Sequence, residues 1–180
     1  MKRKAISREG NGLAFNIAKA INRLVMNSLV FFTLFSNAGL FAARPIEKKV
    51  NEPAPLFKLS NLAGEAVSLI QFKGRPVILF FWTTWCPYCR QELSTLQKEY
   101  SNITSGGVTL LAIDIGEPKE KVERFLKDRN IGFTVLLDIN SETAYSYNLI
   151  GVPTFVLIDA QGKIKFQDNI FPDNYLSILK

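Results

Sequence analysis

Hydrophobic residues alternate between unbroken runs and helical spacing through most of the chain. Residues 77–82 (VILFFW) form a continuous apolar run rich in β-favouring residues, which is typical of a strand buried on both faces. Residues 87–100 follow with Leu93 and Leu96 at helical spacing and Pro87 in the first turn, where its missing N–H costs nothing. A buried strand that leads directly into a helix favours a parallel sheet.

The same alternation continues toward the C-terminus. The pattern predicts a second buried strand over 108–113, a charged helix over 119–129, a third strand over 134–137, and a closing hairpin with strands over 154–159 and 164–166. Parallel pairing with an antiparallel edge defines the fold class. We expect an α/β domain with a central mixed sheet flanked by helices.

Shorter patterns mark the two ends of this domain. Residues 57–59 and 66–69 are short β-type segments on either side of a turn, so they predict an N-terminal β-hairpin extension that opens the domain as a flap. Residues 172–180 leave barely two turns for a closing helix. Residues 44–55 are punctuated by proline and predict a linker, which leaves residues 56–180 as the folded domain.

The first 43 residues have the order of an export signal. Residues 2–23 are basic and polar, and they precede the apolar run 24–35 and a small-residue region that offers a cleavage site after Ala38. If they are not cleaved, residues 24–43 are long enough to span the roughly 30 Å hydrocarbon layer as a signal anchor. We therefore predict that residues 1–43 are a signal peptide or a signal anchor; a buried core helix is the alternative. The domain is then expected to be exported.

Charge and composition narrow the function. The 180-residue chain has a net charge of +6, but residues 1–43 hold six basic residues and one acidic residue, so the rest of the chain carries only +1. A nucleic-acid partner therefore has little electrostatic support. The chain has no histidine, which excludes Ser-His and Cys-His catalysis and haem ligation through imidazole. With two cysteines, and methionine only at Met1 and Met26, soft metal ligands are too few, so we expect no metal site.

The two cysteines carry the candidate chemistry. Cys86 and Cys89 are separated by Pro87 and Tyr88 and lie where the predicted strand ends and the predicted helix begins. Free N–H groups and the dipole at a helix N-terminus stabilise a thiolate, so we expect Cys86 to be the acidic, exposed thiol. The spacing lets Cys89 attack a mixed disulfide held on Cys86. A structural disulfide, half of a metal site and inert core cysteines are the alternatives, although a disulfide that closes so short a loop restricts the unfolded chain little.

Four segments together carry a more specific pattern. They are residues 57–59 (FKL), 67–74 (VSLIQFKG), 81–93 (FWTTWCPYCRQEL) and 151–159 (GVPTFVLID). This pattern resembles the thioredoxin superfamily and, within it, the exported TlpA/ResA-like thiol-disulfide oxidoreductases, which include the cytochrome c maturation reductases. The resemblance covers about residues 53–166. It implies a thioredoxin-like fold and a redox-active disulfide in place of any bound cofactor.

The resemblance also implies roles for residues around the cysteines. Pro153 is expected to follow a cis peptide bond and to lie against the disulfide, while the backbone of Val152 pairs with a bound substrate segment. An ordinary loop proline is the alternative. Trp85, Pro87 and Tyr88, which flank the first cysteine, complete the predicted substrate-binding residues.

The acidic residues of this chain match the TlpA/ResA pattern at one position and differ from thioredoxin at another. Thioredoxin itself has a buried aspartate six residues before its first cysteine, and this chain has Phe80 there. In the TlpA/ResA branch a glutamate three residues after the second cysteine lies near the disulfide, and Glu92 occupies that place. A carboxylate buried near a thiol pair tunes the thiol titrations or accepts a proton from Cys89, so Glu92 is the third predicted catalytic residue. A solvated helix carboxylate is the alternative.

The sequence thus predicts an exported thiol-disulfide oxidoreductase that reduces client disulfides in the periplasm or at the outer face of the inner membrane. The resemblance implies clients such as apocytochrome c and re-reduction by a membrane electron donor of the DsbD/CcdA type. An oxidant or isomerase is the first alternative. A peroxiredoxin is disfavoured because Leu79 stands where the peroxidase pattern has proline, although Thr83 fits it. A metallochaperone of the Sco type normally adds a distant histidine, which this chain lacks.

Overall fold

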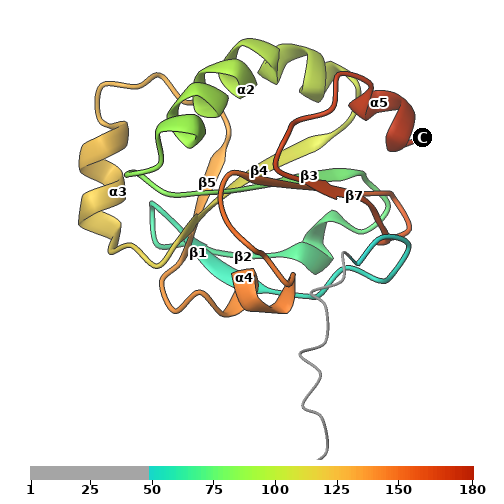
Figure 1. Ribbon diagram of the computed structural model, residues 1–180, viewed down its shortest axis with the longest axis horizontal. Helices are drawn as coiled ribbons and strands as arrows, with labels where there is room; N and C mark the ends of the chain where they lie inside the picture. The colour runs from blue at the N-terminus through green and yellow to red at the C-terminus, as the bar shows by residue number, and fades with distance from the viewer. Residues whose placement is uncertain (1–48) are drawn as a thin grey trace, which may run out of the picture. The chain divides into compact units, whose positions relative to one another are not determined.

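A seven-stranded mixed sheet forms the centre of the domain, in the order β2-β1-β5-β4-β3-β6-β7 (Figure 1). The computed structural model describes residues 49–180, so the predicted export signal lies outside the described residues. β3 pairs parallel with β4, and β4 with β5, whereas the remaining pairs are antiparallel. The strands are β1 (Lys58–Asn61), β2 (Ala66–Ser68), β3 (Val77–Trp82), β4 (Thr109–Ile115), β5 (Thr134–Asp138), β6 (Thr154–Ile158) and β7 (Ile164–Asp168).

Helices cover both faces of this sheet. The helices are α2 (Pro87–Ser105), α3 (Lys119–Leu126), α4 (Glu142–Ser146), α5 (Tyr175–Ile178) and the 3₁₀ helix η1 (Leu69–Phe72). α2, α3 and α5 pack on one face and share one hydrophobic cluster, while η1 and the chain around α4 contribute to a second cluster on the other face. Within residues 49–180, no helix has both the length and the apolar character needed to cross a bilayer.

β3 is the strand around which both clusters form. All six of its residues are buried, as its unbroken apolar run predicts. Because side chains alternate along a strand, Phe80 and Trp82 join the cluster under α2, whereas Leu79 and Phe81 join the opposite one. Phe80 stacks on Phe155 of β6 with ring centroids 5.0 Å apart. The position at which thioredoxin has a buried aspartate is therefore filled here by an aromatic core contact.

The N-terminal hairpin is part of the sheet rather than a flap. β1 pairs antiparallel with β5 through Ser60 and Asn61, so β1 and β2 extend the sheet at one edge. The sequence pattern did not predict η1 or α4, since each is too short to show a helical repeat. α4 begins where the buried carboxylate of Asp138 accepts the backbone N–H groups of Thr143 and Ala144.

The segment before β1 is fixed to the opposite edge of the sheet. Asn51 and Ala54 donate backbone hydrogen bonds to the carbonyl groups of Ile164 and Gly162 in the β6–β7 hairpin. The hydroxyl of Tyr147, a fully buried residue after α4, donates to the carbonyl of Pro55 over 2.8 Å. Burial raises the pKa of the Tyr147 hydroxyl, so it remains a hydrogen-bond donor at all ordinary pH values.

Removing this hydroxyl should cost measurable stability. Tyr147→Phe leaves the carbonyl of Pro55 without its buried donor, so we expect the free energy of unfolding to fall by about 1–3 kcal/mol. Tyr145→Phe is the matched control, because Tyr145 is 77% exposed two residues earlier; its effect should stay within about 0.5 kcal/mol. Chemical denaturation of the two variants measures both values, and equal effects would contradict the structural role assigned to Tyr147.

Candidate active site

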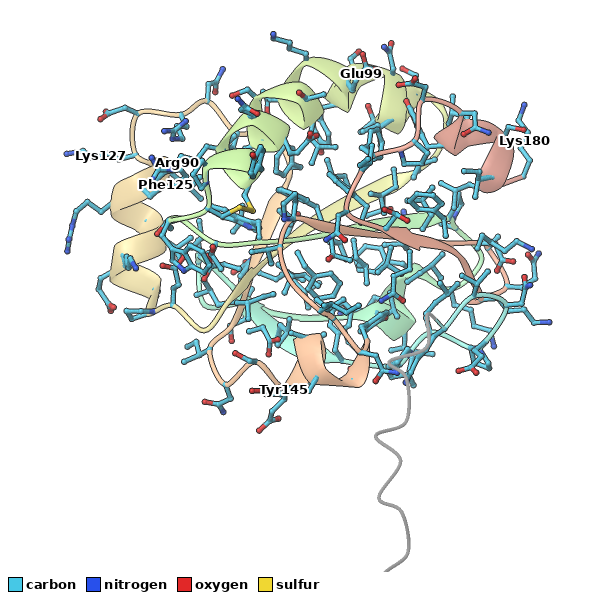
Figure 2. All side chains as sticks on the ribbon, in the orientation of Figure 1. Arg90, Glu99, Phe125, Lys127, Tyr145 and Lys180 are labelled. Atoms are coloured by element: carbon cyan, nitrogen blue, oxygen red, sulfur yellow. A yellow bond between two sulfur atoms is a disulfide. The ribbon has the colours of Figure 1, made fainter. Side chains whose placement is uncertain are left out.

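The two cysteines lie at the N-terminus of α2, where β3 delivers them. β3 ends at Trp82, three loop residues follow, and Cys86 is the N-cap residue of the helix. Cys86 and Cys89 form a disulfide with their Cα atoms 5.2 Å apart, visible as the yellow bond at the start of α2 in Figure 2. The backbone N–H of Cys89 points at Cys86 Sγ over 3.1 Å. This free N–H of the first helical turn is a donor able to stabilise a thiolate on Cys86.

Cys86 is more buried than the sequence predicts. Cys86 is 3% exposed and Cys89 is 0% exposed, so the expectation of an exposed Cys86 is wrong for the disulfide form. The physical reason is that the first turn of α2 packs into the core cluster that contains Phe80 and Trp82. Cys86 is still the more exposed of the two cysteines. This order suits thiol exchange, in which the attacking thiol must be more accessible than the resolving thiol.

The loop before β6 closes over the disulfide. The peptide bond between Val152 and Pro153 is cis, as the family resemblance implies. The carbonyl oxygen of Val152 lies 3.7 Å from Cys86 Sγ. The side-chain amide of Asn169, which follows β7, donates to the carbonyl of Pro153 and to the hydroxyl of Thr154. Asn169 thus holds this loop in place from a distant part of the sequence, and no local sequence signal identifies it.

The residues that flank Cys86 present a large aromatic surface. Trp85 is 63% exposed, Tyr88 is 71% exposed, and Pro87 between the cysteines is exposed as well. Trp85 and Val152 also line a groove of about 480 Å³ beside α4, which we call the α4 groove. Its other lining residues include Thr83, Ile115, Tyr145 and Ile150. Tyr145 and Ile150 carry no local sequence signal, because only the fold brings them to the groove that Trp85 lines.

The loop residue Thr84 is held on three sides. Its backbone N–H and its hydroxyl donate to the two carboxylate oxygens of Glu117, over 2.6 and 2.9 Å. Its carbonyl accepts a hydrogen bond from Arg90 Nε at 2.9 Å. The Arg90 guanidinium also lies over the ring of Phe125 of α3, 5.7 Å from the centroid (Figure 2). The segment that carries Cys86 is therefore fixed to both α2 and the end of β4.

The chain is similar in sequence to known proteins. The AhpC/TSA family model matches residues 50–167. Thiol-disulfide oxidoreductase ResA of Geobacillus thermodenitrificans is 34% identical over 152 residues, which cover 82% of this chain and 87% of that protein. The chain belongs to the ResA-like thiol-disulfide oxidoreductases of the AhpC/TSA family. ResA of Bacillus subtilis is 35% identical over 141 residues, covering 78% of this chain and 77% of that protein.

A solved structure supports the same conclusion for the fold. The thioredoxin domain of a thiol-disulfide oxidoreductase from Bacteroides vulgatus superposes with a TM-score of 0.64 and 26% identity, over 71% of this chain and 93% of that one. The thioredoxin-like fold and the ResA-like resemblance are thus confirmed. The chain is a thiol-disulfide oxidoreductase, and the Cys86–Cys89 pair is the group able to perform that chemistry.

Glu92 is the carboxylate that the ResA-like pattern places near the thiols. It lies three residues after Cys89 on α2, about one helical turn further on, and is partly buried. Burial raises the pKa of its carboxyl group above the usual value of 4.5. A carboxylate with a raised pKa is a better proton acceptor than a solvated one, so this environment suits the predicted role of Glu92.

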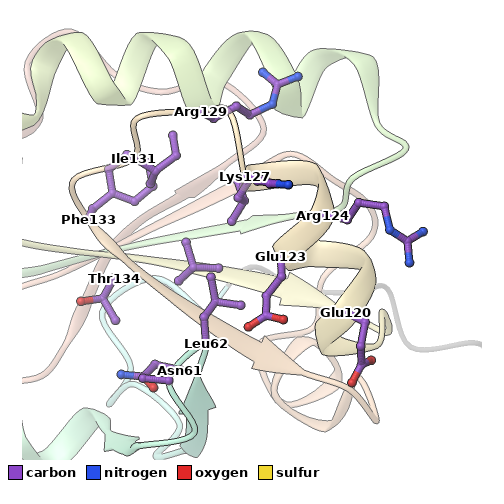
Figure 3. Close-up of a pocket in the computed structure, with 13 residues that line it drawn as sticks. Asn61, Leu62, Glu120, Glu123, Arg124, Lys127, Arg129, Ile131, Phe133 and Thr134 are labelled. Carbon is purple, nitrogen blue, oxygen red and sulfur yellow. The ribbon is translucent and has the colours of Figure 1, made fainter.

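A groove of about 750 Å³ beside α3 lies away from the cysteines. None of the predicted site residues lines it. Figure 3 shows Glu120, Glu123 and Arg124 of α3 on its rim, with Ile131 and Phe133 among its apolar lining. Its lining carries charges of both signs. Within residues 49–180, no cluster of three or more His, Cys, Asp or Glu side chains is arranged to hold a metal ion.

Proposed function

We propose that this enzyme is an exported reductant of protein disulfides, in which Cys86 attacks the client and Cys89 releases it. The thiolate of Cys86 attacks one sulfur of the client disulfide, the client S–S bond breaks, and a mixed disulfide forms while the first client thiolate leaves and takes a proton. Cys89 then loses its proton and attacks Cys86 Sγ. The second client thiolate leaves, so the client gains two electrons and two protons while Cys86 and Cys89 become a disulfide.

The direction of transfer rests on how little stabilises a thiolate on Cys86. Strong oxidants of this class owe their high potential to a stabilised reduced form. Within the described residues 49–180, the donor to Cys86 Sγ is a single backbone N–H, that of Cys89. The nearby guanidinium of Arg90 is directed to the carbonyl of Thr84 and the ring of Phe125 instead. The partly buried carboxylate of Glu92 adds negative charge near the pair, which further disfavours a thiolate and therefore favours a reducing pair.

The surface around Cys86 supports a polypeptide as the client. Trp85 and Tyr88 offer aromatic contact area on one side of the disulfide, and the α4 groove adds Tyr145 and Ile150 on the side of Val152. In our proposal the backbone of Val152, held beside Cys86 by the cis bond to Pro153, pairs with an extended client segment. Such a surface suits an unfolded or flexible client, and apocytochrome c with its C-x-x-C-H haem-attachment motif is the client class we propose.

Export and re-reduction complete the proposal. Residues 1–43 deliver the domain to the periplasm or anchor it at the outer face of the inner membrane through residues 24–43. An oxidising compartment supplies no thioredoxin-like reductant of its own. We therefore propose that a membrane electron donor of the DsbD/CcdA type reduces the Cys86–Cys89 disulfide after each turnover.

The order of attack can be trapped. In the full-length chain, Cys89→Ser should accumulate a mixed disulfide between Cys86 and a peptide that carries an oxidised C-x-x-C-H motif, because the resolving thiol is absent. Cys86→Ser is the matched control, since it keeps one thiol in the same turn but places it at the fully enclosed position. Non-reducing electrophoresis and mass spectrometry measure the adduct. Equal trapping by both variants would reverse or remove the assigned roles.

The proton acceptor can be tested separately. Glu92→Gln should slow resolution of the mixed disulfide by about 10²-fold, the usual scale of general-base catalysis, while the alkylation of Cys86 is not slowed, because loss of the negative charge does not disfavour its thiolate. In the unsubstituted enzyme the resolution rate should fall as the pH drops through the raised pKa of Glu92, because the protonated carboxyl no longer accepts a proton. The variant should lose this inflection. Glu99→Gln, further along α2, should keep both the rate and the inflection, and a similar loss there would contradict the role of Glu92.

A further inference from the structure

The carboxyl group of Asp114 is buried and has no hydrogen-bond donor among residues 49–180. Asp114 lies at the end of β4, opposite Trp82 of β3 in the parallel register, and is 0% exposed. Neither of its carboxylate oxygens accepts a hydrogen bond from an N–H or O–H group of residues 49–180. Burying a charged group in this state is costly, so such a residue indicates a functional constraint rather than a packing preference.

The placement of Asp114 connects it to the cysteines. Side chains alternate along β4, and Ala112, two residues earlier, belongs to the same core cluster as Cys86 and Cys89. Asp114 therefore points to the face of the sheet that α2 and the disulfide cover. Glu117, the residue that holds Thr84, is a polar neighbour of Asp114.

Asp114 and Glu117 differ in the hydrogen bonds and charges that surround their carboxyl groups. Glu117 accepts the N–H and the hydroxyl of Thr84, and the ammonium group of Lys121 lies 2.5 Å from its Oε1. Burial alone would raise the pKa of Glu117, but the hydrogen bonds from Lys121, Thr84 and Asp114 outweigh it, so its pKa lies below the usual value. For Asp114, burial and the adjacent Glu117 raise the pKa to about 9. Glu117 is therefore the ionised partner, and Asp114 is the one that keeps a proton.

Two carboxyl groups in contact form a hydrogen bond only when one of them carries a proton. We propose that Asp114 is a positioning residue of the redox-active loop: its protonated carboxyl donates to Glu117, and Glu117 in turn holds Thr84, two residues before Cys86. This assignment is independent of the direction in which electrons flow. The other charged groups around the pair are Lys121 from α3, which contacts Glu117, and Arg90 from α2, which contacts the carbonyl of Thr84.

The proposal makes the loop sensitive to alkaline pH. When Asp114 loses its proton, two negative charges face each other in a buried site and the hydrogen bond between them is lost. The hydrogen bonds from Thr84 to Glu117 should then weaken, although Lys121 still favours the charge on Glu117. An asparagine at position 114 keeps an N–H donor toward Glu117 and has no proton to lose.

Nuclear magnetic resonance of the oxidised full-length chain tests this directly, because neither cysteine titrates in the disulfide. The Asp114 side-chain carboxyl carbon should titrate with a midpoint near pH 9, the value that its surroundings impose. The backbone amide of Thr84 should shift with the same midpoint. In Asp114→Asn the Thr84 resonance should stay flat over this range, whereas Lys121→Arg, which keeps its charge throughout, should retain the inflection.

Asp138→Asn supplies the matched control. Asp138 is also buried at the end of a neighbouring strand, but its carboxylate oxygens accept the N–H groups of Thr143 and Ala144. This variant should lose stability yet keep the Thr84 inflection. An Asp114 carboxyl that titrates near its ordinary value of 3.8, or a Thr84 inflection that persists in Asp114→Asn, would overturn the proposal. Neither readout involves a client or a redox partner, so failure here is distinct from failure of the proposed reductase activity.

Thermal unfolding of the oxidised chain gives a second test with a defined sign. The folded state keeps a proton on Asp114 that the unfolded chain releases at an ordinary aspartate pKa, so stability should fall as the pH rises from about 4 toward 9. Asp114→Asn removes this component, so its melting temperature should rise relative to that of the unsubstituted chain as the pH increases. A variant that is less stable by the same amount at every pH would show a merely structural role and overturn the proposal.

Discussion

The chemistry of this enzyme depends on one junction, where the buried strand β3 ends and the N-terminus of α2 begins. The strand is buried along its whole length, so the point at which the chain leaves the sheet is fixed by the core. Cys86 then caps the helix, and the N–H of Cys89 meets its sulfur. A thiolate in this position receives one backbone N–H of the first helical turn, that of Cys89. Of the two cysteines, Cys89 is the fully enclosed one.

Three distant segments complete the site around this junction. The loop with Val152 and the cis peptide bond to Pro153 comes from the start of β6, and Asn169 beyond β7 fastens it. Glu117, beyond the end of β4, fixes Thr84 in the loop that carries Cys86. All of them meet at one edge because β3 and β4 run parallel, while β6 runs antiparallel and begins where β3 ends. The sheet topology therefore explains why residues so far apart in the chain form one site.

The sequence predicted those features whose signal is local. An unbroken apolar run identified β3, helical spacing identified α2, and the Cys86–Cys89 spacing identified the redox chemistry. The burial of Cys86 was not predicted, since it depends on how the first turn of α2 packs against Trp82 and Phe80. The predicted strand over 108–113 ends one residue before Asp114, and no local pattern marks that residue. Asp114 becomes important only in the fold, which places the carboxylate of Glu117 against it. No hydrogen-bond donor in residues 49–180 reaches the oxygens of Asp114.

The central claim is that weak stabilisation of the Cys86 thiolate makes this pair a reductant. The equilibrium reduction potential of the Cys86–Cys89 pair, measured in the full-length chain against glutathione or dithiothreitol buffers, tests it most directly. We predict a value near the thioredoxin end of the scale, about −270 mV. A value near about −120 mV, as for DsbA, would mean that the reduced form is strongly stabilised, and it would contradict this account in favour of an oxidant or isomerase.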